Sequence, residues 1–204
     1  MVAAVSGKIF EIEISKSKII ASYNLQRGSR VLNLIEVNNL LGFDNGIYFG
    51  EYFNNENGSP VSIYKRESKG EWTPIFTFGN SRIGHIHNLI VDNFRNCIWI
   101  FTGDKDKHVG IWKAEGNFEK VFAILKGDQK FRACIALPLK DRIIYATDSQ
   151  EKSNAIYEII FHENDNISLN KIVNVEGSVI YGTLFKDHFV CSTSVEPDMS
   201  IKTS

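Results

Sequence analysis

Two histidines, His85 and His87, are separated by one residue within an apolar segment. Side chains alternate along a strand, so residues two apart point to the same face. Two imidazoles that converge in this way suit one divalent metal ion, with carboxylates such as Asp104 or Asp148 completing the site. Alternatively, the two histidines hydrogen-bond to neighbouring loops. A His-x-His pair alone is common, so the pattern leaves both a divalent metal and no cofactor open.

Arg132 is a second candidate for a binding role, because a guanidinium group matches a carboxylate with two parallel hydrogen bonds. This predicts an acidic ligand. The alternative, which we favour for this residue taken singly, is a structural ion pair with Asp104 or Asp148 from an adjacent repeat.

Asp104 and Asp148 are also candidates for a pair of carboxylates that hydrolyses a glycosidic bond, which needs a separation of roughly 5–10 Å. Both follow threonine-containing strand ends, where aspartate commonly caps a turn by accepting backbone N–H bonds. The turn-capping interpretation is the better supported one, and no residue is identified as catalytic.

The elements that must position these side chains repeat along the chain. An isoleucine followed by an aromatic and a charged residue occurs four times, at intervals of 54, 48 and 45 residues. The four copies begin at Ile9, Ile63, Ile111 and Ile156. A recurrence of about 40–50 residues in a strand-rich chain is typical of β-propeller blades. No segment shows a convincing helical period, so we expect an all-β propeller of four-stranded antiparallel blades.

The strand patterns place each candidate site residue in a blade. We expect innermost strands at 30–37, 85–91, 132–137 and 179–185, and outer strands at 18–25, 72–78, 118–125 and 168–175. The single domain 1–204 then divides into a half blade (1–28), three blades (29–79, 80–126 and 127–176) and a half blade (177–204). These sixteen strands form either an incomplete arc or, if the half blades pair, a closed four-bladed ring. The abrupt ending favours a truncated arc, whose open edges would promote self-association.

In a propeller, the innermost strand begins and the second strand ends at the same face. Loops that converge on a rigid scaffold commonly carry ligand sites. We therefore expect the ligand-binding residues to share one axial mouth. These residues are His85, His87, Asp104, Arg132, Asp148 and Glu196.

The turns that follow two of the isoleucine motifs carry a family signal. Residues 65–72 and 113–118 resemble degraded copies of the Asp-box, the Ser-x-Asp-x-Gly-x-x-Trp turn of sialidase-like (BNR-repeat) propellers; the glycine and the following aromatic residue are kept. Segments between His85 and Ser149 also resemble uncharacterised members of that family. The resemblance implies a propeller, and Asp-box turns in the family are structural. Sialidases bind the substrate carboxylate with an arginine cluster. Here only Arg82 and Arg132 are placed to join one, with Arg30 as a more remote candidate, and no nucleophilic tyrosine is recognised.

Composition limits the classes of partner. The formal net charge of −1 gives no electrostatic reason to expect nucleic acid, and no apolar run is long enough to span a membrane. Cys97, Cys134 and Cys191 lie in apolar strand patterns, which predicts buried free thiols and a cytoplasmic location.

Two function classes follow from these observations. The first is a non-catalytic propeller that binds a saccharide or a protein at its polar axial face. The second is a glycoside hydrolase or polysaccharide lyase that acts on acidic sugars. The small number of candidate arginines and the degraded Asp-boxes favour the non-catalytic binding protein over the enzyme.

Overall fold

A computed structural model describes residues 1–150, 152–186 and 188–194 of the chain. Every strand pairing in these residues is antiparallel. Helical structure in the described residues consists of short 3-10 turns, namely η1 (Ile14–Lys16), η2 (Ser68–Gly70), η3 (Asp106–His108), η4 (Gln129–Phe131) and η5 (Glu163–Asp165). None of these helices has the length and apolar character needed to span a bilayer. The expected all-β class with four-stranded antiparallel sheets is confirmed.

The strands form five sheets that follow one another along the sequence. The first sheet contains β1 (Val2–Val5), β2 (Lys8–Glu13) and β3 (Lys18–Asn24). The second contains β4 (Leu34–Val37), β5 (Gly46–Gly50), β6 (Val61–Arg66) and β7 (Trp72–Phe78). The third contains β8 (His85–Asp92), β9 (Cys97–Gly103), β10 (Gly110–Glu115) and β11 (Lys120–Lys126). The fourth contains β12 (Ala133–Pro138), β13 (Arg142–Thr147), β14 (Asn154–Phe161) and β15 (Ile167–Val175), and the terminal hairpin contains β16 (Ser178–Phe185) and β17 (His188–Ser194).

The repeated isoleucine–aromatic motif coincides with a recurring irregularity of strand pairing in the three four-stranded sheets. A β-bulge interrupts the pairing of the third and fourth strands between Ile63 and Tyr64, between Ile111 and Trp112, and between Ile156 and Tyr157. A bulge turns a strand locally and increases its twist. In the first sheet the corresponding irregularity lies between Glu11 and Ile12 instead.

The first sheet differs from the expected two-stranded half blade, because it contains the additional strand β1. This strand was not predicted, since two of its four residues are alanines, which have low strand propensity. The local signal was the Ser6-Gly7 turn. Both residues have positive φ angles (48° and 78°), as a two-residue hairpin loop between the paired residues Val5 and Lys8 requires.

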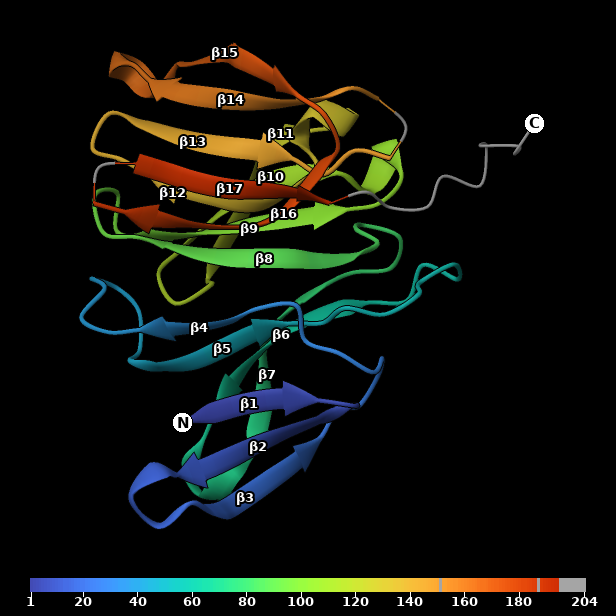
Figure 1. Cartoon of the computed structure of the whole chain (residues 1–204), viewed down its shortest axis with the longest axis vertical. Coiled ribbons are helices and arrows are strands. Elements are labelled where there is room, and N and C mark those ends of the chain that lie inside the picture. Colours follow the sequence, from blue (N-terminus) through green and yellow to red (C-terminus); the bar gives the residue numbers. More distant parts are fainter. Residues whose placement is uncertain (151, 187, 195–204) are drawn as a thin grey trace.

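The first strands of the later sheets form a row through the molecule (Figure 1). Strand β8 contacts both β4 and β12, and β12 contacts β16. A backbone hydrogen bond of 2.9 Å from the amide of Ile86 to the carbonyl of Glu51 links the start of β8 to the end of β5. The beginnings of first strands and the ends of second strands therefore meet, as the site hypothesis requires.

Apolar cores lie between neighbouring sheets. One core contains Ile63 and Ile100, and a second contains Trp99 and Tyr145. All seven residues of β9 are buried, which explains its continuous apolar sequence, since a strand covered on both faces has no polar side.

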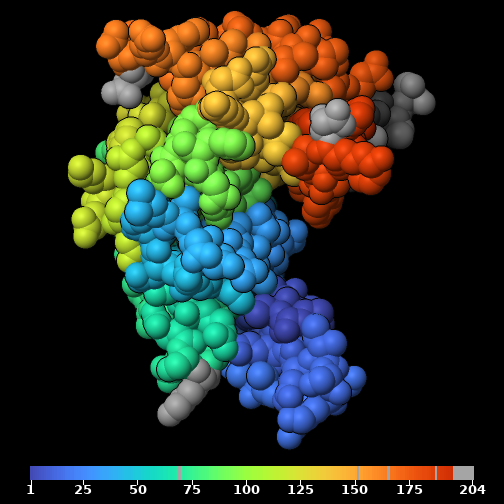
Figure 2. Space-filling model, turned by 90° about the vertical axis from the view of Figure 1, so that its left-hand side faces the viewer, coloured from blue at the N-terminus to red at the C-terminus, as the bar shows by residue number. Residues whose placement is uncertain are grey.

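The first sheet and the terminal hairpin lie apart in the described residues (Figure 2). The alternative expectation of a closed four-bladed ring is therefore wrong for this structure. In such a ring β17 would pair with β2, but β1 already occupies that edge of β2. The hairpin exposes Tyr181 (71%) and Phe185 (61%). Self-association through open edges stays a prediction.

Candidate functional site

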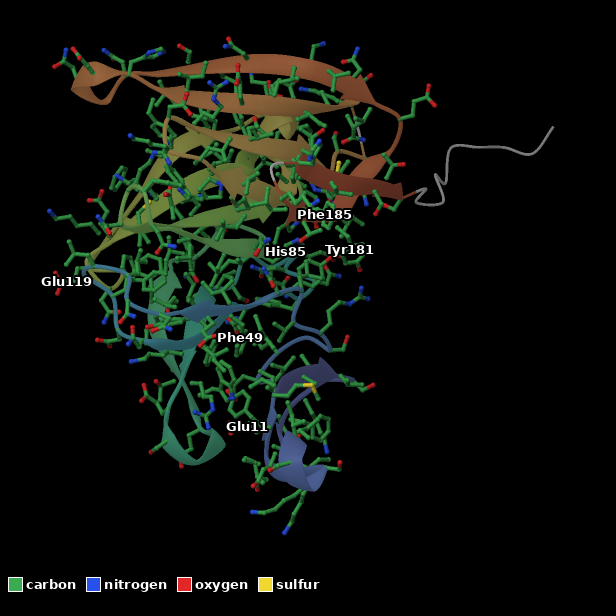
Figure 3. All side chains as sticks on the ribbon, turned by 60° about the vertical axis from the view of Figure 1, so that its left-hand side comes forward. Glu11, Phe49, His85, Glu119, Tyr181 and Phe185 are labelled. Carbon is green, nitrogen blue, oxygen red and sulfur yellow. The ribbon has the colours of Figure 1, made fainter. Side chains whose placement is uncertain are left out.

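Five of the six predicted site residues converge where β8, β9, β12 and β13 meet. His85 and His87 come from β8, Asp104 directly follows β9, Arg132 directly precedes β12, and Asp148 directly follows β13. His85 lies near the middle of the molecule, away from Glu11 at the junction of the first and second sheets (Figure 3). The sixth residue, Glu196, lies outside the described residues.

His85, His87 and Asp104 form what we call the outer cluster. The Nε2 atoms of His85 and His87 are 3.0 Å apart, and they lie 3.2 and 3.3 Å from Oδ1 of Asp104. The two histidines are buried, whereas the Asp104 side chain is 46% exposed. The three donor atoms thus form a nearly equilateral triangle that reaches the surface through the aspartate.

His87, Cys134 and Asp148 form an inner cluster that uses the other nitrogen of the same histidine. The Cys134 thiol lies 3.5 Å from Nδ1 of His87 and 3.3 Å from Oδ2 of Asp148. All three residues are buried. Burial, followed by the neighbouring Asp148, raises the pKa of Cys134 well above its ordinary value, so the sulfur stays a thiol.

Two bulges in the first strands create this convergence. The pairing of β8 with β9 shifts between Ile86 and Asn88, which leaves His87 as the extra residue. The pairing of β12 with β13 shifts in the same way around Cys134. Bulges re-aim side chains and are frequent next to functional sites. The alternation of side chains along a strand did not predict that Cys134 belongs to the inner cluster. The sequence pattern indicated Cys134 only as a buried thiol.

Arg132 connects the two clusters. Its NH2 group lies 3.0 Å from Oδ1 of Asp104 and 3.4 Å from Oδ2 of Asp148. The predicted ion pairs of Arg132 with these aspartates are confirmed. The other arginine considered for a carboxylate-binding cluster, Arg82, lies elsewhere, with its guanidinium carbon 5.2 Å from the ring centre of Trp112.

Burial and hydrogen bonding set the ionisation of the outer cluster. Burial by itself raises the pKa of Asp104, but hydrogen bonds with His85 and His87 outweigh it and hold this pKa below its ordinary value. Burial also lowers the pKa of His87. An ionised Asp104 therefore faces a His87 that resists protonation.

The surrounding loops hold Asp104 in place and leave room for His87. The Gln129 side-chain amide donates a 2.8 Å hydrogen bond to the carbonyl of Asp104. A Cβ atom on Gly103 would lie only 2.5 Å from Cε1 and Nε2 of His87, so glycine is needed there for packing. Neither role was predicted from the sequence.

A pocket of about 350 Å³ opens beside the outer cluster. His85 and Asp104 line it, together with Tyr52 and Arg30 from the loops around the second sheet. The ring centres of Tyr52 and His85 are 4.3 Å apart, and the Arg30 guanidinium carbon lies 5.9 Å from the Tyr52 ring centre. Tyr52 follows the end of β5, a second strand, so strand polarity places it at the expected face; it was not predicted because charged and imidazole side chains were the candidates there.

Comparison of the chain with family models found no match, and comparison with curated proteins found none either.

Proposed function

We propose that the chain is a β-propeller-type binding protein that takes a saccharide in the pocket beside the outer cluster. The order of the three four-stranded sheets, with their first strands in one row, supports the propeller assignment, and so does the repeat of about 40–50 residues. The open row supports an incomplete arc.

The conformation of the two Asp-box-like turns supports the proposed resemblance to sialidase-like propellers. Gly70 and Gly116 have positive φ angles of 76° and 56°, which favour glycine. The aromatic residues that follow, Trp72 and Phe118, are buried in the cores. These turns support a structural role rather than a catalytic one.

The observation that carries the binding proposal is the setting of Asp104. Its half-exposed carboxylate is fixed by two buried histidines and the buried Arg132, so it is a rigid acceptor at the pocket wall. Ligand pockets combine apolar or aromatic surface with a few precisely placed polar groups. Tyr52 supplies the aromatic surface, and Asp104 and Arg30 supply groups that can bond to sugar hydroxyls.

The alternative, a hydrolase or lyase for acidic sugars, has weaker support. Two carboxylates must flank the scissile bond in most glycosidases, yet Asp148 is buried against Arg132 and Cys134. Arg132 already pairs with two carboxylates, so it is not free to bind a sugar carboxylate. We therefore propose a neutral, hydroxyl-rich ligand.

The free thiols of the three cysteines are relevant to the cellular location of the protein. Cys97 and Cys134 are buried and unpaired with other cysteines, and Cys191 is partly exposed and also free. Free thiols are usual in reducing compartments, which supports the proposed cytoplasmic location.

A glycan array followed by calorimetry with the best neutral glycan tests the binding proposal. We expect Asp104→Asn to weaken binding about 10-fold or more, because hydrogen bonds to charged groups contribute about 1.5–3 kcal/mol. Asp141→Asn is the matched control, since Asp141 pairs with Arg142 at an exposed site away from the pocket. No glycan binding, or binding that Asp104→Asn leaves unchanged, would refute the proposal. Turnover of a bound glycan would favour the enzyme alternative, and capture of a protein alone would favour a protein partner.

A further inference from the structure

We propose that the outer cluster binds one divalent first-row transition-metal ion, such as Zn²⁺, through Nε2 of His85, Nε2 of His87 and Oδ1 of Asp104. The inference does not depend on the proposed saccharide binding.

The separations of the three donor atoms match a metal-binding triangle. They are 3.0, 3.2 and 3.3 Å. Zinc binds histidine nitrogen and carboxylate oxygen at about 2.0–2.2 Å, which places neighbouring ligand atoms about 3.0–3.4 Å apart for octahedral to tetrahedral angles. The triangle therefore needs little rearrangement to hold an ion. Two histidines and one carboxylate are also a common ligand set for zinc and for non-haem iron.

The other ring nitrogen of His85 has a partner of the kind that supports a metal-binding histidine. Its Nδ1 atom lies 3.3 Å from the carbonyl oxygen of Phe53. Backbone carbonyls are among the groups that orient metal-binding histidines through the nitrogen that does not bind the metal.

Exposure distinguishes the outer cluster from the inner one as a metal site. Asp104 and His85 line the 350 Å³ pocket, so an ion there keeps an open side for water or another oxygen ligand. The carboxylate of the inner cluster, Asp148, is buried, so an ion bound there has no comparable open side. We therefore assign the ion to the outer cluster alone.

The test uses the full chain, freed of metal by a chelator and titrated with Zn²⁺ in the absence of any glycan. We expect calorimetry and metal analysis to give one ion per chain, and Co²⁺ to produce visible absorption bands of a histidine-ligated centre. His85→Gln should weaken Zn²⁺ binding more than about 10-fold, the lower limit for losing even a supporting partner of a metal ligand. His162→Gln is the control, because His162 is an exposed histidine that bonds to Ser168 outside the cluster.

Asp104→Asn provides a second variant in case the buried His85 cannot be replaced without unfolding. Its side chain is half exposed, and the variant should fold, as judged by circular dichroism, yet bind Zn²⁺ at least about 10-fold more weakly. The proposal is overturned if no stoichiometric ion binds, or if folded His85→Gln and Asp104→Asn variants bind as tightly as the parent. It is also overturned if His162→Gln removes the binding, or if NMR shows His85 doubly protonated in protein titrated with Zn²⁺ at neutral pH.

Discussion

The outer and inner clusters share His87 and use similar donor groups, yet their surroundings differ. The outer cluster reaches a pocket through Asp104, whose side chain is 46% exposed, whereas the carboxylate of the inner cluster, Asp148, is only 5% exposed. An accessible carboxylate can exchange its partners for a ligand, but a buried one must keep them, because an unpaired buried charge costs several kcal/mol. We infer that the inner cluster stabilises the fold and positions His87, while the outer cluster is available for binding.

The largest expected effect follows from neutralising the buried carboxylate. Asp148→Asn removes the charge that pairs with Arg132 and accepts from the Cys134 thiol. We expect the free energy of unfolding to fall by about 3 kcal/mol, the lower end for breaking a buried ion pair, because Arg132 keeps Asp104.

Urea denaturation measures this loss. The control is Asp128→Asn, since Asp128 forms solvent-accessible ion pairs with Lys130 and Lys152 and should contribute about 0–1 kcal/mol. Equal losses in the two variants would contradict the division into a structural and a binding cluster.

The next effect tests the packing that both clusters share. Gly103→Ala places a Cβ atom 2.5 Å from the buried ring of His87 and 3.4 Å from Nε of Arg132. We expect a loss of about 1–3 kcal/mol, typical of overpacking, with a shifted His87 ring signal by NMR. Gly79→Ala is the control, because no atom lies within 4 Å of the added Cβ. An unchanged His87 signal in the Gly103 variant would contradict this expectation, because it would show that the added methyl group is accommodated without moving the ring.

A smaller effect concerns alkaline pH. The ordinary thiol pKa is 9.0, and burial raises that of Cys134 well above it, so the unfolded chain loses this proton before the folded protein does. Stability should therefore fall as pH rises above 9, with a slope of up to about 1.4 kcal/mol per pH unit from this group.

Cys134→Ser removes the titrating thiol and should flatten the alkaline slope relative to the parent, as measured by urea denaturation between pH 8 and 10.5. Cys191→Ser should change the slope less, because Cys191 is only partly buried. A Cys134→Ser variant with the parent slope would show that the inner cluster is open to water.

The sequence predicted much of this arrangement for identifiable reasons. Strand polarity placed the start of β8 beside the ends of β9 and β13, and it correctly brought His87 and Asp148 to one region. The pairing of Arg132 with both aspartates also followed from that placement. The isoleucine repeat and the alternating patterns located the later strands, whereas β1 escaped because alanines carry little strand signal.

Other features depended on contacts between distant segments. The bulges at His87 and Cys134 arise from strand pairing, which local sequence does not record. The unequal exposure of Asp104 and Asp148 depends on which loops cover each carboxylate. Sequence could therefore nominate both aspartates as equivalent candidates, but it could not assign one to a pocket and the other to the interior.

The smallest stability effect is expected for Asp104, although it is central to both binding proposals. Arg132 retains Asp148 when Asp104 is neutralised, and a half-exposed carboxylate recovers much of its hydration in either state. We expect Asp104→Asn to change the free energy of unfolding of the metal-free protein by less than about 1 kcal/mol. Urea denaturation of the metal-free protein, compared with Asp148→Asn under the same conditions, measures the difference. If Asp104→Asn lowered the free energy of unfolding as much as Asp148→Asn does, the outer cluster would also be needed for stability. Weaker ligand binding by Asp104→Asn would then reflect unfolding and not the loss of a contact with the ligand.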